Sequence, residues 1–250
     1  MRYSVFAGGK RLRPILAMAS YEIVGGKGKQ ILSNACALEL IHTYSLIHDD
    51  LPCMDDDDLR RGKPTSHRVF GEGMAVLAGD ALHALAFEML LKTKNPQVIE
   101  EVVQSIGTKG MIGGQVADLE AEGKKVKPAQ VAYIHSHKTG ALIKASVRVG
   151  ALLGGADRKK LNALSGYGEK IGLAFQITDD VLDVEGKEEI VGKKIGADEK
   201  KATYPKVMGL EKSKKIAKDL VESAKKDLEI FSKKRIIFER LADYIVSRVK

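Results

Sequence analysis

The sequence predicts an all-α fold in a single domain, and three observations carry this prediction. Apolar residues recur three and four positions apart wherever the 250-residue chain is periodic, which is the spacing of one helix face. No segment alternates apolar and polar residues as a half-buried strand does. A hydrophobic fraction of 44% and a charged fraction of 30% are ordinary for one globular domain, and we find no repeat of solenoid length.

The expected helices are separated by breaks rich in glycine, proline or charge. They cover residues 14–24, 30–48, 73–92, 96–122, 128–153 and 160–184, and, after a loop at 185–205, residues 213–231 and 236–250. The second of them, QILSNACALELIHTYSLIH, is apolar nearly all round, so we expect a buried helix about 28 Å long.

Composition limits the classes of protein that need to be considered. The two cysteines, Cys36 and Cys53, have no spacing typical of a disulfide framework or a zinc site, which favours a reducing cytoplasm. No uninterrupted apolar run reaches the ~18 residues of a membrane span, and no secretion signal follows Met1. A net charge of +8 favours anionic partners, namely nucleic acid, phosphorylated substrates or acidic membrane surfaces.

A dense acidic cluster follows the buried helix in the stretch HDDLPCMDDDDLRRG. Six of the ten residues at 49–58 are aspartates. Like charges about 5 Å apart repel by roughly 3 kcal/mol at an effective dielectric constant of about 20, so cations must offset this cost. Asp49 and Asp55 are six residues apart, with Pro52 between them, whereas on an undistorted helix Asp56 would lie under Asp49. Spacing alone therefore does not select the second ligand.

A second acidic cluster, QITDDVLD, ends another apolar helix. Asp179 and Asp183 are four residues apart, so they lie one turn from each other on one face and can share a cation. The helix dipole opposes aspartate at a helix C-terminus, so another interaction must favour it there. Carboxylate oxygens at helix ends, with room for phosphate and water, suit magnesium.

Basic residues stand beside glycine, proline and the aspartate clusters. Guanidinium and ammonium groups are natural ligands of diphosphate oxygens. Such residues occur in GGKRLRP, LRRGKP, HKTGA and the late loop, and they are Lys10, Arg11, Arg13, Arg60, Arg61, Lys138, Lys193, Lys194, Lys200 and Lys201. His42 lies on the buried helix, where a lone histidine is more often a hydrogen-bonded core residue than a ligand.

Five motifs of this sequence, in this order, resemble those of the short-chain trans-prenyl diphosphate synthases, in particular the bacterial farnesyl diphosphate synthases. These motifs are GGKRLRP, LIHDDLPCMDDDDLRRGKPT, HSHKTGALI, GLAFQITDDVLD and ATYP. The resemblance spans nearly the whole chain. It implies the isoprenoid synthase fold, a homodimer of all-α subunits in which helices surround a deep central cavity. It also implies that residues 1–250 form one polyprenyl synthetase domain that lacks the N-terminal helices usual in the family.

The resemblance also implies roles for individual residues. Asp49, Asp50, Asp55, Asp179 and Asp183, with Asp180 in the second motif, would hold about three Mg²⁺, with Mn²⁺ as an alternative metal, on an allylic diphosphate. Catalysis would depend on Asp49, Asp50, Asp55, Asp179 and Lys138. The allylic diphosphate would be bound by Arg60, Lys138, Thr139, Gln176, Lys193 and Lys201, and isopentenyl diphosphate by Lys10, Arg13, His42 and Arg61. The expected product is farnesyl diphosphate, and no side-chain base is required.

Product length is expected to depend on Tyr44. This residue lies five before Asp49, hence about 7.5 Å below it along a helix. Ser45, four before Asp49, shares the aspartate's face more closely but is small, so Tyr44 is the bulkier candidate for a cavity floor. In the resembled family, an aromatic residue here is typical of fifteen-carbon producers.

Three alternatives remain open at this point. The first is a geranylgeranyl diphosphate synthase, which has the same acidic motifs. The second is an HD-type phosphohydrolase built on His48 and Asp49, which leaves the second motif unexplained. The third is a helical nucleic-acid binder, although the basic residues do not gather on one helix face with interleaved aromatics.

Overall fold

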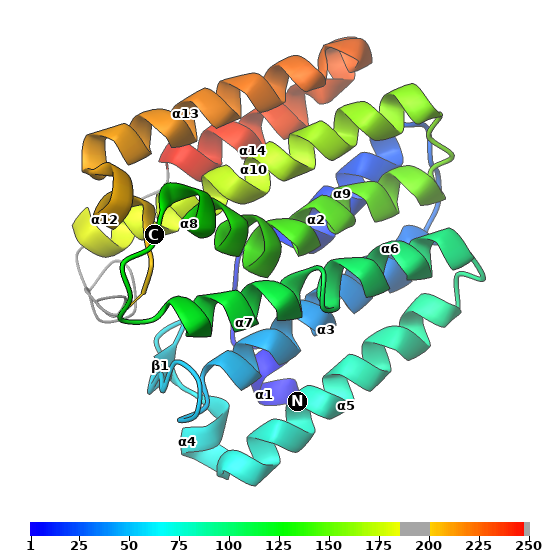
Figure 1. Ribbon diagram of the computed structural model, residues 1–250. Coiled ribbons are helices and arrows are strands. Elements are labelled where there is room, and N and C mark those ends of the chain that lie inside the picture. Colours follow the sequence, from blue (N-terminus) through cyan, green and yellow to red (C-terminus); the bar gives the residue numbers. More distant parts are fainter. Residues whose placement is uncertain (186–200, 248–250) are drawn as a thin grey trace.

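The computed structural model describes residues 1–185 and 201–247, and almost all of this chain is helical (Figure 1). The elements are α1 (Arg2–Val5), α2 (Leu12–Ile23), α3 (Ile31–Asp49), β1 (Leu59–Arg60), β2 (Lys63–Pro64), α4 (Ser66–Phe70), α5 (Glu72–Leu91), α6 (Pro96–Ile106), α7 (Met111–Ala121), α8 (Pro128–Ile134), η1 (His135–Gly140), α9 (Ala141–Leu153), α10 (Arg158–Glu185), α12 (Tyr204–Met208), α13 (Leu210–Asp227), η2 (Glu229–Arg235) and α14 (Ile236–Ser247). The all-α prediction is confirmed.

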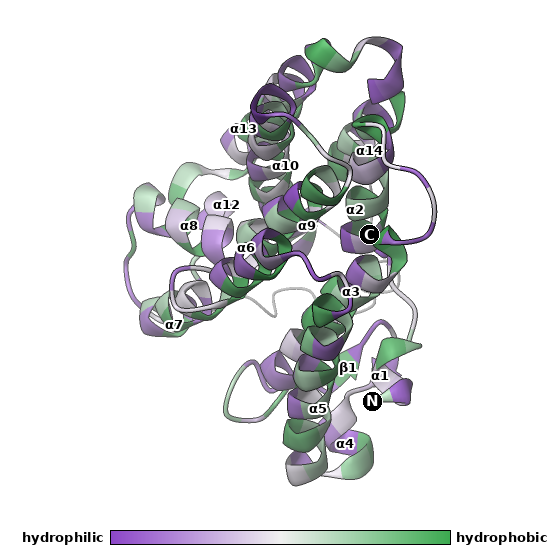
Figure 2. Ribbon diagram, turned by 90° about the vertical axis from the view of Figure 1, so that its right-hand side faces the viewer, coloured by the Kyte–Doolittle hydropathy of each residue, from purple (hydrophilic) through white to green (hydrophobic). Residues whose placement is uncertain are grey.

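The long helices are stacked side by side across the molecule. From one edge to the other the packed order is α13, α10, α9, α2, α3 and α5, and Figures 1 and 2 show this stack from two sides. Helices α3 and α10, which carry the two acidic motifs, therefore lie on either side of the central pair α2 and α9. Their buried faces belong to two different hydrophobic clusters.

Two of the expected helices differ from the structure in an informative way. The stretch 96–122 is divided at Gly107–Gly110 into α6 and α7, and a Cβ at Gly110 would collide with the backbone of Ser105. The stretch 128–153 continues through η1, a π-helical segment that joins α8 to α9. The remaining unexpected elements, such as α1, α4 and α12, are too short for periodicity to reveal.

The one sheet among the described residues is a two-stranded hairpin directly after the first acidic motif. Leu59 pairs with Pro64 and Arg60 with Lys63, so Arg61 and Gly62 form a two-residue turn. Both turn residues have positive φ, 55° and 72°, as a type I′ turn requires. The hairpin thereby sends the adjacent Arg60 and Arg61 in different directions.

Helix α5 differs from the expectation that no segment could span a membrane. By length and composition alone it qualifies, with a window of mean hydropathy 1.6 of which 28% is buried. One such helix is weak evidence, because the core helices of soluble proteins pass the same test. Its exposed apolar side chains include Met74, Leu77 and Leu91.

Candidate active site

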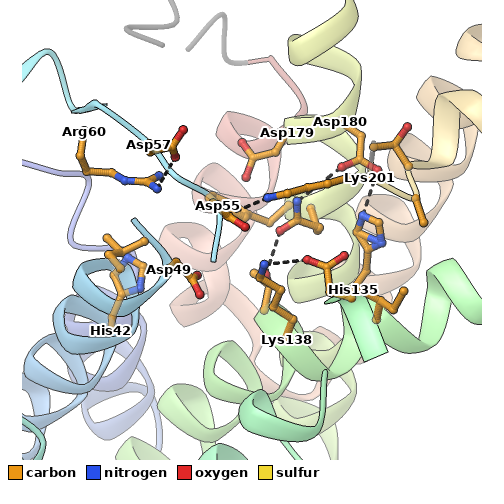
Figure 3. Close-up of a pocket in the computed structure, with 18 of the residues that line it drawn as sticks. His42, Asp49, Asp55, Asp57, Arg60, His135, Lys138, Asp179, Asp180 and Lys201 are labelled. Atoms are coloured by element: carbon orange, nitrogen blue, oxygen red, sulfur yellow. Dashed lines mark hydrogen bonds and ion pairs between the residues drawn. The ribbon is translucent and has the colours of Figure 1, made fainter. Parts of the chain in front are cut away.

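A cavity of about 280 Å³ lies between the C-terminal ends of α3 and α10 (Figure 3). Its lining draws on widely separated parts of the chain. Among the residues expected at the site, it contains Arg13, His42, Asp49, Asp55, Arg60, Lys138, Thr139, Gln176, Asp179, Asp180 and Lys201. The two acidic motifs therefore face one another across a single cavity.

The first motif reaches the cavity because the chain turns back on itself after α3. The backbone N–H of Asp55 donates to the carbonyl of Asp49 at 2.8 Å, which places the two aspartates together despite their separation of six residues. Asp56 instead adopts a left-handed conformation with φ of 51° and is exposed. Of the two candidates, Asp55 is therefore the one that lies beside Asp49 at the cavity.

Asp50 has a different position from its two motif partners. It is buried, does not belong to the cavity lining, and accepts hydrogen bonds from Nε of Arg60 at 2.8 Å and from the Nη2 of the same arginine. A second carboxylate, that of Asp57, accepts from Arg60 at 2.8 Å. Asp50 and Asp57 together hold the Arg60 guanidinium at the cavity wall, and their charges raise the pKa of Arg60 against the effect of burial.

In the second motif the three aspartates also divide. Asp179 lines the cavity, whereas Asp183 is buried one turn further along α10 and is outside the lining. Asp180 lies 2.9 Å from Nε2 of His135 and accepts the backbone N–H of Tyr204 at 2.9 Å. Asp180 therefore ties α10 to both η1 and α12.

Segment η1 brings the HKTG residues against α10. A Cβ at Gly172 would lie 2.8 Å from the Cα of Gly140, so the two backbones cross in direct contact. This crossing allows the Thr139 hydroxyl to donate to Oε1 of Gln176 at 2.8 Å. π-helical turns inside α-helices frequently occur at functional sites, because they change which side chains face a cavity.

Lysines neutralise the carboxylates at the centre of the cavity. Lys138 donates to Asp118 of α7 at 2.7 Å, and Lys201 donates to Oδ2 of Asp55 at 2.7 Å (Figure 3). Burial acts to raise the pKa of Asp55, but Lys138 and Lys201 outweigh it and lower that pKa. For Asp49 burial prevails, and its pKa is raised although Lys138 opposes the shift.

The residues expected to bind isopentenyl diphosphate are divided between the cavity and its surroundings. Arg13 and His42 line it, whereas Lys10 and Arg61 do not. Arg61 donates to the carbonyl of Gly8, and Nζ of Lys10 lies 6.0 Å from the centre of the Phe175 ring. Burial, followed by the charges of Arg13 and Arg61, lowers the pKa of His42 well below 6.5, so its imidazole is neutral.

Tyr44 and Ser45 lie on α3 below Asp49, and neither is part of the lining of the cavity. Tyr44 is buried in the hydrophobic cluster that includes Ile41, Ile47 and Leu82. Lys193, Lys194 and Lys200, by contrast, lie outside the described residues.

Sequence reasoning missed Asp118 and His135, both of which line the cavity. His135 is three residues before Lys138 and four before Thr139, a spacing that places it on their face of a helix. Asp118 is the only acidic residue in GGQVADL, a stretch of mostly small and apolar residues. A carboxylate in such a stretch is expected to be buried only if a cation lies next to it.

Among the described residues no three ligating side chains lie close enough together to hold a metal ion by themselves, so a divalent cation here would complete its coordination with phosphate and water oxygens. Oδ1 of Asp55 is buried and has no hydrogen-bond partner within residues 1–185 and 201–247. Asp49 and Asp179 offer further carboxylates from opposite sides (Figure 3). Several hard oxygen ligands on different elements, with open space between them, are the arrangement in which Mg²⁺ bridges protein and phosphate oxygens.

An all-α stack with two acidic motifs facing each other across a cavity lined by lysine and arginine is suited to an enzyme that binds diphosphate esters and transfers groups from them. A family model described as Polyprenyl synthetase matches residues 1–239. The chain belongs to this family and is a trans-prenyltransferase of isoprenoid synthesis.

Curated relatives carry two different product names. A geranylgeranyl diphosphate synthase of Cyanophora paradoxa is 53% identical over 99% of this chain and 86% of its own length. The farnesyl diphosphate synthase of Escherichia coli K12 is 48% identical over 100% of this chain and 88% of its own length. Similarity across the whole chain therefore leaves the product length open.

Solved structures share the fold closely. A polyprenyl synthase from Caulobacter crescentus, complexed with calcium and isoprenyl diphosphate, superposes with a TM-score of 0.93 at 31% identity, covering 100% of this chain and 88% of that one. A geranyltransferase from Helicobacter pylori, complexed with magnesium and isoprenyl diphosphate, gives 0.88 at 35% identity, covering 98% of this chain and 85% of that one.

Proposed function

We propose that this enzyme condenses isopentenyl diphosphate with dimethylallyl and then geranyl diphosphate to give farnesyl diphosphate. The observation that carries the proposal is the buried Tyr44 ring on α3, below an aspartate-lined cavity. The test is an incubation with magnesium, radiolabelled isopentenyl diphosphate and each allylic primer, followed by chromatography of the products. A main product of twenty carbons from the wild-type enzyme would contradict the assignment.

The reaction begins when the carbon–oxygen bond of the allylic diphosphate breaks and the diphosphate leaves with the electron pair. Bound Mg²⁺, which we propose at about three per site, supplies fixed positive charge to the leaving group. Lys138, Arg60 and Lys201 add ammonium and guanidinium donors at the cavity wall, so charge developing on the diphosphate meets preorganised cations. We assign Asp49, Asp55 and Asp179 as the metal ligands that face the cavity.

The allylic cation is then attacked by the double bond of isopentenyl diphosphate. Arg13 and neutral His42 lie on the part of the wall where we place this second substrate. The new carbon–carbon bond leaves a tertiary cation, which loses a proton. The released diphosphate, held beside Lys138, accepts that proton, so no side-chain base is required.

Tyr44→Ala is expected to lengthen the product to twenty carbons or more. Removing the phenol ring opens space below Asp49, and steric discrimination in a hydrophobic pocket is worth roughly 10- to 200-fold. Chain-length analysis of the mutant products is the measurement. A Tyr44→Ala enzyme that still stops at fifteen carbons would exclude Tyr44 from this role.

Arg61→Ala is expected to raise the KM for isopentenyl diphosphate about tenfold and that for the allylic substrate much less, with the reverse for Arg60→Ala. Loss of one charged hydrogen bond costs about 1.5–3 kcal/mol, and the hairpin directs the two guanidiniums to different neighbours, Gly8 and Asp50. Lys63→Ala, which removes one positive charge from the same exposed hairpin, is the matched control. Equal changes in both KM values would mean that the arginines do not divide the two substrates.

We also propose a homodimer located in the cytoplasm. The support for a dimer is the exposed apolar side chains on α5 and α7, among them Leu77, Leu91, Ile112 and Val116. Contact with a second copy would remove this surface from water. Sedimentation analysis should give twice the chain mass, and a monomer at micromolar concentration would contradict the proposal.

The free cysteines Cys36 and Cys53 are consistent with a reducing compartment.

A further inference from the structure

Four aromatic rings form a row in the groove between α3 and α5. His48 and Tyr44 come from α3, with ring centroids 5.8 Å apart, and His83 and Phe87 come from α5, 5.1 Å apart. The Tyr44 and His83 rings join the two pairs at 4.7 Å. Helix α5 can approach this closely because residue 79 is glycine, where any Cβ would overlap the His48 imidazole.

The middle of the row contains two buried polar atoms without a partner. Within residues 1–185 and 201–247, the hydroxyl oxygen of Tyr44 and Nε2 of His83 have no hydrogen bond. A buried polar atom left unpaired costs about 1–3 kcal/mol. Burial lowers the pKa of His83, so its imidazole is neutral at pH 7 and one of its nitrogens can accept a hydrogen bond.

A donor and an acceptor that both lack partners, on rings in contact, are suited to each other. The tyrosine hydroxyl can donate and a nitrogen of the neutral imidazole can accept, and the two ring centroids are 4.7 Å apart. Phe87, one turn further along α5, packs edge-on against His83 with an angle of 88° between the ring planes and restricts the rotation of the imidazole. The α5 side of the groove is therefore a support for the Tyr44 ring.

We propose that His83 is a positioning residue for product length, which holds the Tyr44 ring in place by ring contact and by accepting its hydroxyl proton in a hydrogen bond. This inference rests on the proposed function, in which Tyr44 limits the growing chain. Without His83, the Tyr44 ring is free to turn toward α5 when a fifteen-carbon chain presses against it. The reacting groups at Asp49 and Asp179 are untouched, so chain length should change while the first condensation proceeds normally.

The experiment compares His83→Leu with His83→Gln, since the first keeps the volume without an acceptor and the second keeps an acceptor. Each enzyme is given geranyl and isopentenyl diphosphates with magnesium, and the ratio of twenty- to fifteen-carbon product is measured. We expect at least a roughly tenfold rise for His83→Leu and a ratio close to wild type for His83→Gln. Phe238→Leu, which disrupts the remote edge-on pair of Tyr167 and Phe238, controls for lost stability and should leave the ratio unchanged.

A double variant separates positioning from simple widening of the cavity. If His83 acts through Tyr44, His83→Leu adds nothing to the product ratio of Tyr44→Ala, because the group it positions is already gone. A product ratio in the double variant that exceeds that of Tyr44→Ala would overturn the positioning role. So would an unchanged ratio in His83→Leu, or a ratio in His83→Gln equal to that in His83→Leu. If Tyr44→Ala lengthens the product while His83→Leu does not, only the present inference fails. An unchanged ratio in both removes the Tyr44 floor as well.

Discussion

Asp49→Ala is expected to lower turnover at saturating substrates by about 100- to 1,000-fold, and Asp179→Ala by a similar factor. Electrostatic stabilisation of a departing group is commonly the largest single contribution to catalysis, and losing one such group costs roughly 100- to 1,000-fold. Each aspartate lines the cavity from its own side, so neither can replace the other. Steady-state turnover over a range of magnesium concentrations is the measurement.

The fold should survive these substitutions. Asp49 is a half-buried carboxylate whose pKa is raised by desolvation and by the charge of Asp55, although Lys138 opposes the shift, so its removal relieves an unfavourable interaction. The free energy of unfolding should therefore stay level or increase. Asp58→Ala is the matched control, because Asp58 is exposed and pairs with Arg68 instead of facing the cavity. Near-normal turnover of Asp49→Ala would contradict the metal assignment.

Lys138→Met is expected to reduce turnover by about 100- to 1,000-fold, the range for losing one preorganised donor to developing negative charge. The positive charge of Lys138 acts to lower the pKa of both Asp49 and Asp55, although burial leaves the pKa of Asp49 raised overall. Without it these pKa values rise, so the acidic limb of the pH–rate profile should move to higher pH. The pH dependence of turnover therefore tests this role independently of its size.

The same substitution should also weaken the fold. Asp118 is buried and loses its partner, which costs about 1–3 kcal/mol of unfolding free energy. Lys144→Met provides the control, because Lys144 lies six residues further along and pairs with the exposed Glu169. A Lys138→Met enzyme with an unshifted pH profile would show that this lysine does not act on the two aspartates.

Long-range order along the chain could be predicted from the sequence because helix periodicity extends over many residues. Helices α3, α5 and α10 were expected within two residues of their observed bounds. The division between α6 and α7 was not expected, because the break at Gly107–Gly110 depends on a close approach of backbones that periodicity does not contain. Similarly, the choice between Asp55 and Asp56 depended on a turn closed by the Asp49 carbonyl.

The candidate site could be predicted in its residue types but less fully in its geometry. The resemblance assigned Asp50 to metal, and the structure instead places it beneath Arg60, a tertiary contact across a ten-residue separation. Lys10 and Arg61 were expected at the second substrate and lie beside the cavity, outside its lining. His135 and Asp118 were missed because their significance lies in the partners they meet, Asp180 and Lys138, which are distant in sequence.

The backbone contact between Gly140 and Gly172 has a consequence for how such an enzyme can diversify. No side chain separates η1 from α10 there, so the distance between the two elements is set by main chain, and the side chains of Thr139 and Gln176 meet across that fixed distance. The Tyr44 end of the molecule, in contrast, is bounded by side chains that single substitutions can enlarge or remove. If Tyr44 limits chain length as proposed, a protein built in this way keeps one head group geometry constant while single substitutions change the length of hydrocarbon it accepts.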